Sequence, residues 1–193
     1  MALPPHLAGR LASLYAEMEA AYDRVAGATA FSCTGCPDNC CDSYFQHHTY
    51  LEWAYAWQGL AAQPPERRQA ILARAREIAD ATPIILARGE RPQLMCPANE
   101  AGLCTLYAHR LMICRLHGVP SVLTRPDGSR LAFPGCFRFQ EQGAAGQVPP
   151  LDRTDLYRRL ARLEQELTCS HRPPLPRVRL TLAGMLAQGP PPC

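Results

Sequence analysis

The cysteine pattern constrains this chain more than any other feature of its sequence. Ten cysteines occur in 193 residues, a share of about 5% that lies above the average protein and below a small disulfide scaffold. Most of them fall in the middle of the chain, so a fold that gathers thiols around an irregular centre is expected. The cysteines of this central segment are Cys33, Cys36, Cys40, Cys41, Cys96, Cys104, Cys114 and Cys136.

Composition indicates a globular protein of a reducing compartment. The chain is 47% hydrophobic and 19% charged, which excludes wholesale disorder. Residues 1–25 lack the apolar segment of a signal peptide, and no stretch has the roughly 18 consecutive apolar residues of a membrane span. We therefore expect a cytoplasmic location and no membrane partner. Structural disulfides are rare there, so the cysteines indicate metal ligation or redox chemistry.

The charged residues exclude several function classes. Lysine and arginine together number 20, all of them arginine, and the formal net charge is +3. Without lysine the chain cannot form a lysine Schiff base or use a P-loop lysine. A net charge this small predicts no nucleic-acid partner.

Hydrophobic periodicity predicts a mainly α-helical fold with one small β-hairpin. Apolar side chains recur at steps of three and four in several segments, as in amphipathic helices. Thr49 and Glu52 have the spacing of a capping box, and residues 125–129 form a turn between two short runs typical of a hairpin. We expect helices at residues 7–25, from Thr49 to Pro64, from Pro65 to Pro83, at 107–116 and at 156–167, and a hairpin of residues 121–124 and 130–133.

The organisation along the chain predicts a single domain over residues 1–193. Residues 31–136 form the irregular cysteine-rich metal-binding centre, packed between an N-terminal helix (1–30) and a C-terminal helix and tail (151–193). Residues 137–150 have the composition of a connector. In the tail, apolar residues alternate as in a strand at 178–182, whereas the residues after them could form a helical turn, so both forms stay open.

The first cysteine loop has the spacing of a metal site. In Cys33-x2-Cys36, the two-residue gap lets both thiolates turn onto one metal ion, and Cys40 can return to that site from the end of the loop. Neighbouring side chains of an extended segment point to opposite faces, so Cys40 and Cys41 suit two sites or two irons of one cluster. The alternatives are small buried thiols or disulfides, and the polar loop and the compartment argue against them.

A second run, Cys96-Pro97-x6-Cys104-Thr105-Leu106-Tyr107-x2-Arg110-x3-Cys114-Arg115, completes a resemblance. Together with the upstream doublet it resembles the YkgJ family of cysteine-cluster proteins, which are described as a zinc- or iron-chelating domain. The resemblance covers residues 31–136. Here the first loop is one residue longer before the doublet, Leu106 replaces an isoleucine, and Leu111 stands where proline is common. The resemblance implies that the metal ligands are Cys33, Cys36, Cys40, Cys41, Cys96, Cys104, Cys114 and Cys136.

Charged and imidazole side chains near these cysteines are further candidates. Arg110 and Arg115 are expected to bind the cofactor, because their positive charges would offset the negative charge of its thiolate ligands. Arg138 could do the same or be an ordinary surface arginine. An imidazole could also replace one thiolate, but we expect solvent or capping roles for the nearby histidines, which are His47, His48, His109 and His117. We expect that Cys169, His171 and Cys193 are not metal ligands.

Soft thiolates select zinc, cuprous copper or iron-sulfur clusters. The uneven first loop with its doublet resembles cluster-binding loops more than the matched pairs of a zinc ribbon, so a [4Fe-4S] iron-sulfur cluster is favoured over zinc. We then expect electron transfer, or an accessory redox or modification role with a protein redox partner. Members of the family are labelled iron-sulfur oxidoreductases, and flagellin lysine methylases carry a similar cluster. The alternative is a zinc-binding structural or protein-interaction module without catalysis.

Overall fold

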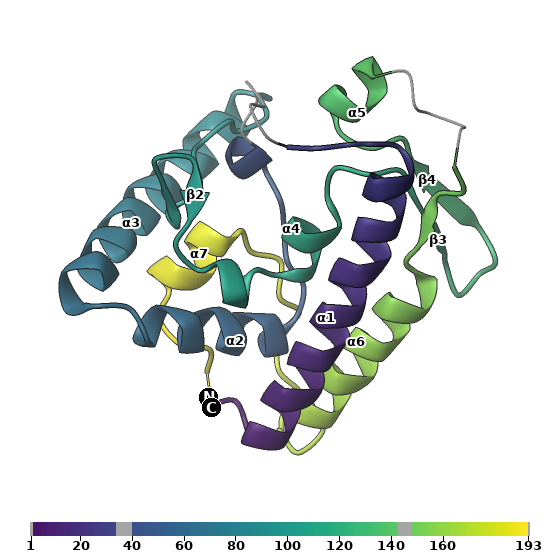
Figure 1. Ribbon diagram of the computed structural model, residues 1–193. Helices are drawn as coiled ribbons and strands as arrows, with labels where there is room; N and C mark the ends of the chain where they lie inside the picture. Colours follow the sequence, from purple (N-terminus) through teal and green to yellow (C-terminus); the bar gives the residue numbers. More distant parts are fainter. Residues whose placement is uncertain (1, 34–39, 143–147, 193) are drawn as a thin grey trace. The chain divides into compact units, whose positions relative to one another are not determined.

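Helices dominate the structure, a computed structural model that describes residues 2–33, 40–142 and 148–192 (Figure 1). The predicted fold class, mainly α with a small β portion, is confirmed. The chain divides into two compact units, each assembled from segments that are distant in sequence. Unit 1 comprises Met1–Pro5, Asn39–Leu111 and Glu166–Cys193, and unit 2 comprises His6–Asp38 and Met112–Gln165. The single domain over residues 1–193 stays a prediction.

Unit 1 is built on helices α2 (Tyr50–Ala61), α3 (Pro65–Ala87) and α7 (Leu182–Ala187). The short helix α7, from the C-terminal end of the chain, lies against α3 and α2 (Figure 1). Burying apolar side chains between these helices stabilises unit 1 through removal of their surface from water. This core contains Leu60, Ile71, Ala75 and Leu186, with Trp57, Leu72 and Leu182 packed against it.

Local signals place the starts of these helices. The Thr49 hydroxyl accepts a 3.2 Å hydrogen bond from the Glu52 amide and donates a 2.9 Å bond to the Glu52 carboxylate, so the predicted capping box is confirmed.

The predicted end of the third helix at Pro83 is wrong, because α3 continues to Ala87. Proline has a φ that suits a helix, so the helix loses one hydrogen bond there without having to stop. The tail forms α7 preceded by an isolated bridge between His47 and Leu180.

Four short elements of unit 1 carry or flank its cysteines. They are the 3-10 turns η1 (Cys40–Asp42) and η2 (Tyr107–His109) and the antiparallel strands β1 (Asn99–Glu100) and β2 (Leu103–Cys104). The predicted single helix over 107–116 is therefore wrong. Arg110 has an extended backbone, with φ −58° and ψ 140°, and it separates η2 from helix α4 (Met112–Leu116).

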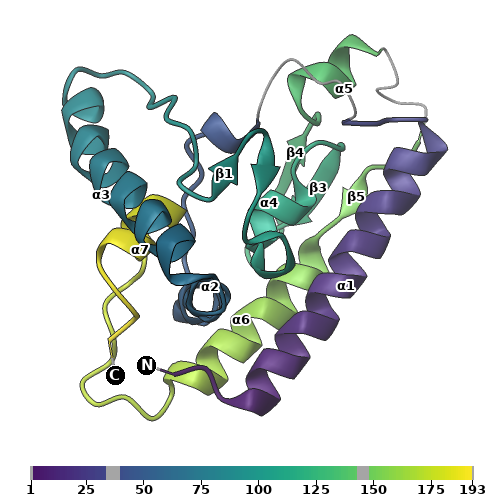
Figure 2. The ribbon, with the colours of Figure 1, turned by 60° about the vertical axis from the view of Figure 1, so that its left-hand side comes forward.

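Unit 2 contains two long helices that lie side by side in both views, α1 (Pro5–Ala28) and α6 (Thr154–Thr168) (Figures 1 and 2). Both predicted helices are confirmed. Each buries one apolar stripe, as an amphipathic helix does. On the outside, Arg159 of α6 forms an ion pair with Glu17 of α1, with 2.6 Å between Nη2 and Oε1. The stripes are Leu7, Leu11, Leu14, Tyr15 and Met18 on α1 and Leu156, Leu160, Leu163 and Leu167 on α6.

A small sheet and two short helices complete unit 2. The predicted hairpin is confirmed as strands β3 (Ser121–Thr124) and β4 (Arg130–Phe133). Strand β5 (Leu151–Asp152) adds to β3 in parallel, so β3 is the central strand (Figure 2). The predicted connector at 137–150 begins instead with helix α5 (Phe137–Glu141), whose Phe139 is fully buried.

In the described ranges no helix combines the length and the apolar character needed to cross a lipid bilayer.

Candidate metal centre

The two units divide the predicted ligand cysteines between them. Cys40, Cys41, Cys96 and Cys104 belong to unit 1, and Cys33, Cys114 and Cys136 belong to unit 2. We call these sets the unit 1 thiols and the unit 2 thiols. None of them, nor Cys169, forms a disulfide among the described residues. Cys36 and Cys193 lie outside the described residues.

Backbone hydrogen bonds bring the unit 1 thiols together. The Cys96 amide donates a 2.8 Å bond to the Cys41 carbonyl, and the Asn99 amide donates a 3.0 Å bond to the Cys96 carbonyl. In the β1–β2 hairpin, Asn99 pairs with Cys104. A chain of main-chain contacts therefore runs from the cysteine doublet through the Cys-Pro segment to Cys104.

The carboxamide of Asn99 organises the turn between β1 and β2. Its Oδ1 accepts a 3.1 Å hydrogen bond from the Gly102 amide, as in an Asx turn. This bond also identifies which end of the carboxamide is oxygen. The opposite atom, Nδ2, is buried and has no acceptor within hydrogen-bond geometry in the described structure. Asn99 was not among the sequence candidates, although an asparagine shortly before Ala101-Gly102 is a turn signal.

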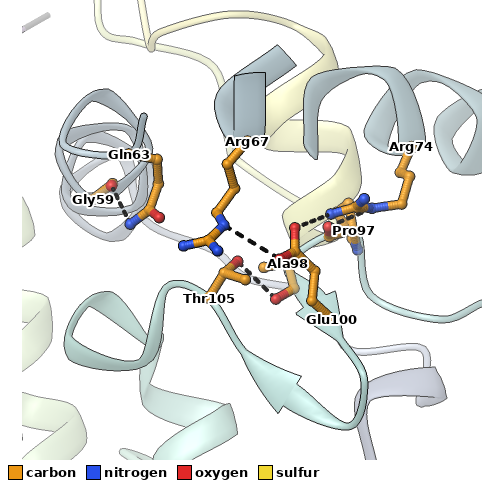
Figure 3. Close-up of polar contacts among 8 residues, drawn as sticks. All are labelled: Gly59, Gln63, Arg67, Arg74, Pro97, Ala98, Glu100 and Thr105. Atoms are coloured by element: carbon orange, nitrogen blue, oxygen red, sulfur yellow. Dashed lines mark hydrogen bonds and ion pairs between the residues drawn. The ribbon is translucent and has the colours of Figure 1, made fainter. Parts of the chain in front are cut away.

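Arginines of α3 hold the same hairpin from outside (Figure 3). Arg74 donates a 3.0 Å hydrogen bond from Nε to the Pro97 carbonyl, and its Nη2 lies 3.1 Å from Oε1 of Glu100. Arg67 approaches the other oxygen of Glu100 at 3.3 Å. We call Arg67, Arg74 and Glu100 the α3 clamp. The sequence analysis assigned the arginines of this helix no role at the site.

The pKa of Cys41 is lowered to about 6. A hydrogen bond from the Cys40 thiol is the largest cause, and burial opposes it. The Asn99 carboxamide and the charge of Arg110 lower the pKa further. Cys41 therefore carries substantial thiolate character at neutral pH, which is the form that binds metals.

The pKa of Cys96 moves the other way, to about 12. Burial is the largest cause, and the neighbouring sulfurs Cys41 and Cys104 raise the pKa further. Crowded thiols cannot all ionise without a compensating charge, and a bound cation supplies that charge. Arg74 lowers the pKa of Cys96 but does not outweigh burial.

Arg110 lies where the sequence analysis expected a cofactor-binding arginine. Its guanidinium stacks 3.8 Å from the centre of the Tyr107 ring, and it acts electrostatically on Cys41. Arg115 is placed differently, in unit 2. It is buried, pairs with Glu19 at 2.6 Å and lies 4.3 Å over the Tyr15 ring, so a carboxylate already balances its charge.

The unit 2 thiols are held by aromatic packing. The Phe31 ring meets the Phe139 ring edge to face at 5.2 Å, which brings together the segments that contain Cys33 and Cys136. The Cys136 amide donates a 2.9 Å bond to the Gly118 carbonyl, and the Tyr22 hydroxyl lies 4.0 Å from the Cys33 sulfur. Cys114 lies in α4, just before Gly118 in the chain.

Two of the four histidines near the cysteines make ring contacts within the protein, and burial is the main influence on the pKa of the other two. His47 is buried, and burial lowers its pKa to about 3. His48 Nδ1 lies 3.2 Å from the Val178 carbonyl, and the His109 ring stacks at 4.6 Å on Tyr55. In unit 2, burial and the charge of Arg153 lower the pKa of His117.

No three cysteine, histidine or acidic side chains among the described residues already lie in a metal-binding arrangement. The donors of unit 1 nevertheless fit a soft cation in their chemistry. They offer sulfur ligands, one thiol of low pKa and the buried Nδ2 of Asn99 without an acceptor. Closing such a site requires changes in side-chain rotamers on loops whose backbones are already joined.

Comparison of the chain with protein-family models, with curated proteins and with solved structures finds no match.

Proposed function

We propose that this chain is a metal-binding thiolate protein of the kind its cysteine pattern resembles, the YkgJ family. It holds an iron-sulfur cluster of the [4Fe-4S] type and uses it for electron transfer, or for an accessory role in a redox or modification reaction. We assign the metal to the unit 1 thiols. The proposed partner is a redox protein, and the proposed compartment is the cytoplasm, which keeps thiols reduced.

One observation carries this proposal. The main-chain bond from Cys96 to the Cys41 carbonyl joins cysteines of the two sequence motifs, and Cys41 is a thiol with a pKa near 6. A structural thiol in an apolar core is inert and protonated. A thiolate joined to further thiols, with arginine charge nearby, is the donor set that iron-sulfur clusters and zinc both use.

A zinc-binding structural module is the second candidate, and the small size of the hairpin favours it. Strands β1 and β2 have two residues each, and Leu103 is 75% exposed. A hairpin this short has little core of its own, and structural zinc commonly supplies folding free energy to such segments.

Metal and sulfide analysis tests the two candidates. Protein purified without oxygen should contain about four irons with matching acid-labile sulfide per chain if one [4Fe-4S] cluster is bound. Zinc without iron would support the structural module instead. Protein with neither metal, after anaerobic reconstitution with iron and sulfide and separately with zinc, would overturn both.

Matched cysteine variants assign the ligands. Cys41→Ser and Cys96→Ser should each reduce the bound metal, whereas Cys169→Ser should leave the metal content unchanged. Cys169 is exposed, and its thiol donates to the local Glu166 carbonyl at 3.4 Å. A Cys169→Ser protein that loses metal while Cys41→Ser retains it would show that the site is elsewhere.

A further inference from the structure

A buried amide donor without an acceptor is the observation that leads beyond the cysteines. Asn99 Nδ2 is shielded from water and finds no partner within hydrogen-bond geometry in the described structure. Leaving a buried N–H group unsatisfied costs free energy, so such atoms are rare and call for an explanation. The Oδ1 end of the same side chain is satisfied by the Gly102 amide.

The backbone around Asn99 fixes the direction of this donor. Its main-chain amide is bonded to the Cys96 carbonyl, and its strand position faces Cys104. The Gly102 bond orients the carboxamide, with Gly102 at φ +84°, a conformation that suits glycine. The carboxamide lowers the pKa of Cys41, so it lies near that sulfur, although no bond within hydrogen-bond geometry joins Nδ2 to it. Asn99 is therefore bonded to Cys96 through its main chain, paired with Cys104 across the hairpin and close to Cys41 through its side chain.

We propose that Asn99 is a positioning residue of the metal centre, and that its Nδ2 donates an N–H···S hydrogen bond to the Cys41 thiolate once a metal is bound. This inference rests on the proposed function. Hydrogen bonds to ligand sulfurs withdraw negative charge from the metal–sulfur unit, and they are among the features that set the reduction potential of a cluster. The donor acts on the metal through Cys41 and does not itself touch it.

Two substitutions separate this donor role from support of the turn. Asn99→Asp keeps an oxygen for the Gly102 amide, removes the N–H donors and adds a negative charge. Asn99→Ala removes both functions without adding a charge. Gln63→Ala is the control, because Gln63 is another carboxamide of unit 1 and its Nε2 is bonded to the Gly59 carbonyl at 3.5 Å (Figure 3).

The measurement uses the reconstituted full chain. For iron-loaded protein it is the midpoint potential, and for cobalt-substituted protein it is the energy of the sulfur-to-cobalt charge-transfer band. Both Asn99 variants should move the potential to more negative values, or the band to lower energy, since the sulfur then carries more charge. Metal affinity should fall about ten-fold to a hundred-fold, as for other groups that hold a ligand. Gln63→Ala should leave the potential and the band unchanged.

The outcomes separate this inference from the proposed function. Wild-type protein that takes up neither iron nor cobalt would overturn both. Wild-type protein that binds metal, with Asn99 variants of unchanged potential and unchanged band, would overturn the role of Asn99 alone. If Asn99→Asp does not fold, as judged by circular dichroism, the neutral Asn99→Ala variant decides the question.

Discussion

The Cys96 amide donates a 2.8 Å hydrogen bond to the Cys41 carbonyl. Because the bond is made by the backbone, it requires neither a metal nor a particular protonation state of the sulfurs. The last cysteine of the first motif is thus attached to the second motif before any ligand binds. A metal that binds unit 1 meets thiols whose main chains are already neighbours, which lowers the entropy cost of gathering them.

The opposite pKa shifts of Cys41 and Cys96 predict different reactivity in metal-free protein. Iodoacetamide should label Cys41 readily at pH 7, with a rate that falls as the pH drops through about 6. Cys96, with a pKa of about 12, should stay the slower of the two between pH 6 and pH 9. Peptide mass spectrometry after short labelling times measures both sites. Equal labelling rates would contradict the assigned shifts.

The same shift of Cys41 affects stability in a defined direction. The folded protein holds this proton less tightly than the unfolded chain, whose thiol has a pKa of 9.0. The stability that Cys41 contributes is therefore complete above about pH 9 and is lost as the pH falls to about 6. Metal-free Cys41→Ser should lack this part of the pH dependence in urea denaturation.

The two arginines of the α3 clamp should contribute unequally to the free energy of unfolding. Arg74→Gln removes a bond to the Pro97 carbonyl as well as the ion pair with Glu100, so it should lower the free energy of unfolding by about 1–2 kcal/mol. Arg67→Gln removes only an exposed ion pair and should cost about 0.5 kcal/mol or less. Urea denaturation of both variants tests this order, and a larger loss in Arg67→Gln would contradict it.

Gly135, next to Cys136 in the chain, packs closely against Gly118 and Phe139. Its φ is +93°, and an added Cβ would lie 2.7 Å from the Gly118 carbonyl oxygen, the acceptor of the Cys136 amide. Gly135→Ala should lower the free energy of unfolding by about 2–4 kcal/mol through strain and overpacking. Gly128→Ala is the control, because Gly128 has a φ of +83° but open space around it. Its cost should be about 1–2 kcal/mol, and an equal loss in both variants would exclude the contact with Gly118 as a cause.

Buried His47 predicts a loss of stability in acid. Burial lowers its pKa from 6.5 to about 3, so the unfolded chain binds a proton that the folded protein does not. The stability from this histidine is complete above about pH 6.5 and falls by about 1.4 kcal/mol per pH unit as the pH drops from there toward 3. His47→Gln should show a shallower fall of unfolding free energy between pH 6.5 and pH 4.5. The same slope in both proteins would rule His47 out as its source.

Predictions that depended on neighbouring residues were the most accurate. Thr49 caps α2 through its hydroxyl and the Glu52 amide, an interaction completed within one turn of chain. The hairpin of β3 and β4 has the predicted bounds because its turn residues and strand residues adjoin. The end assigned to α3 at Pro83 failed because a proline has a φ that suits a helix and removes only local hydrogen bonding, so α3 continues to Ala87.

The sequence by itself determined the helices α1, α2 and α6, the hairpin and the cysteine motifs, since each depends on residues that are close in the chain. Only the tertiary structure decided that Cys41 and Cys96 share a unit while Cys33 and Cys136 belong to the other. It also decided that Arg110 acts on Cys41 whereas Arg115 pairs with Glu19. The roles of Asn99 and the α3 clamp could not be read from the sequence either. Their contacts join segments that come together only when helices pack and loops close, and spacing along a chain does not encode such distances.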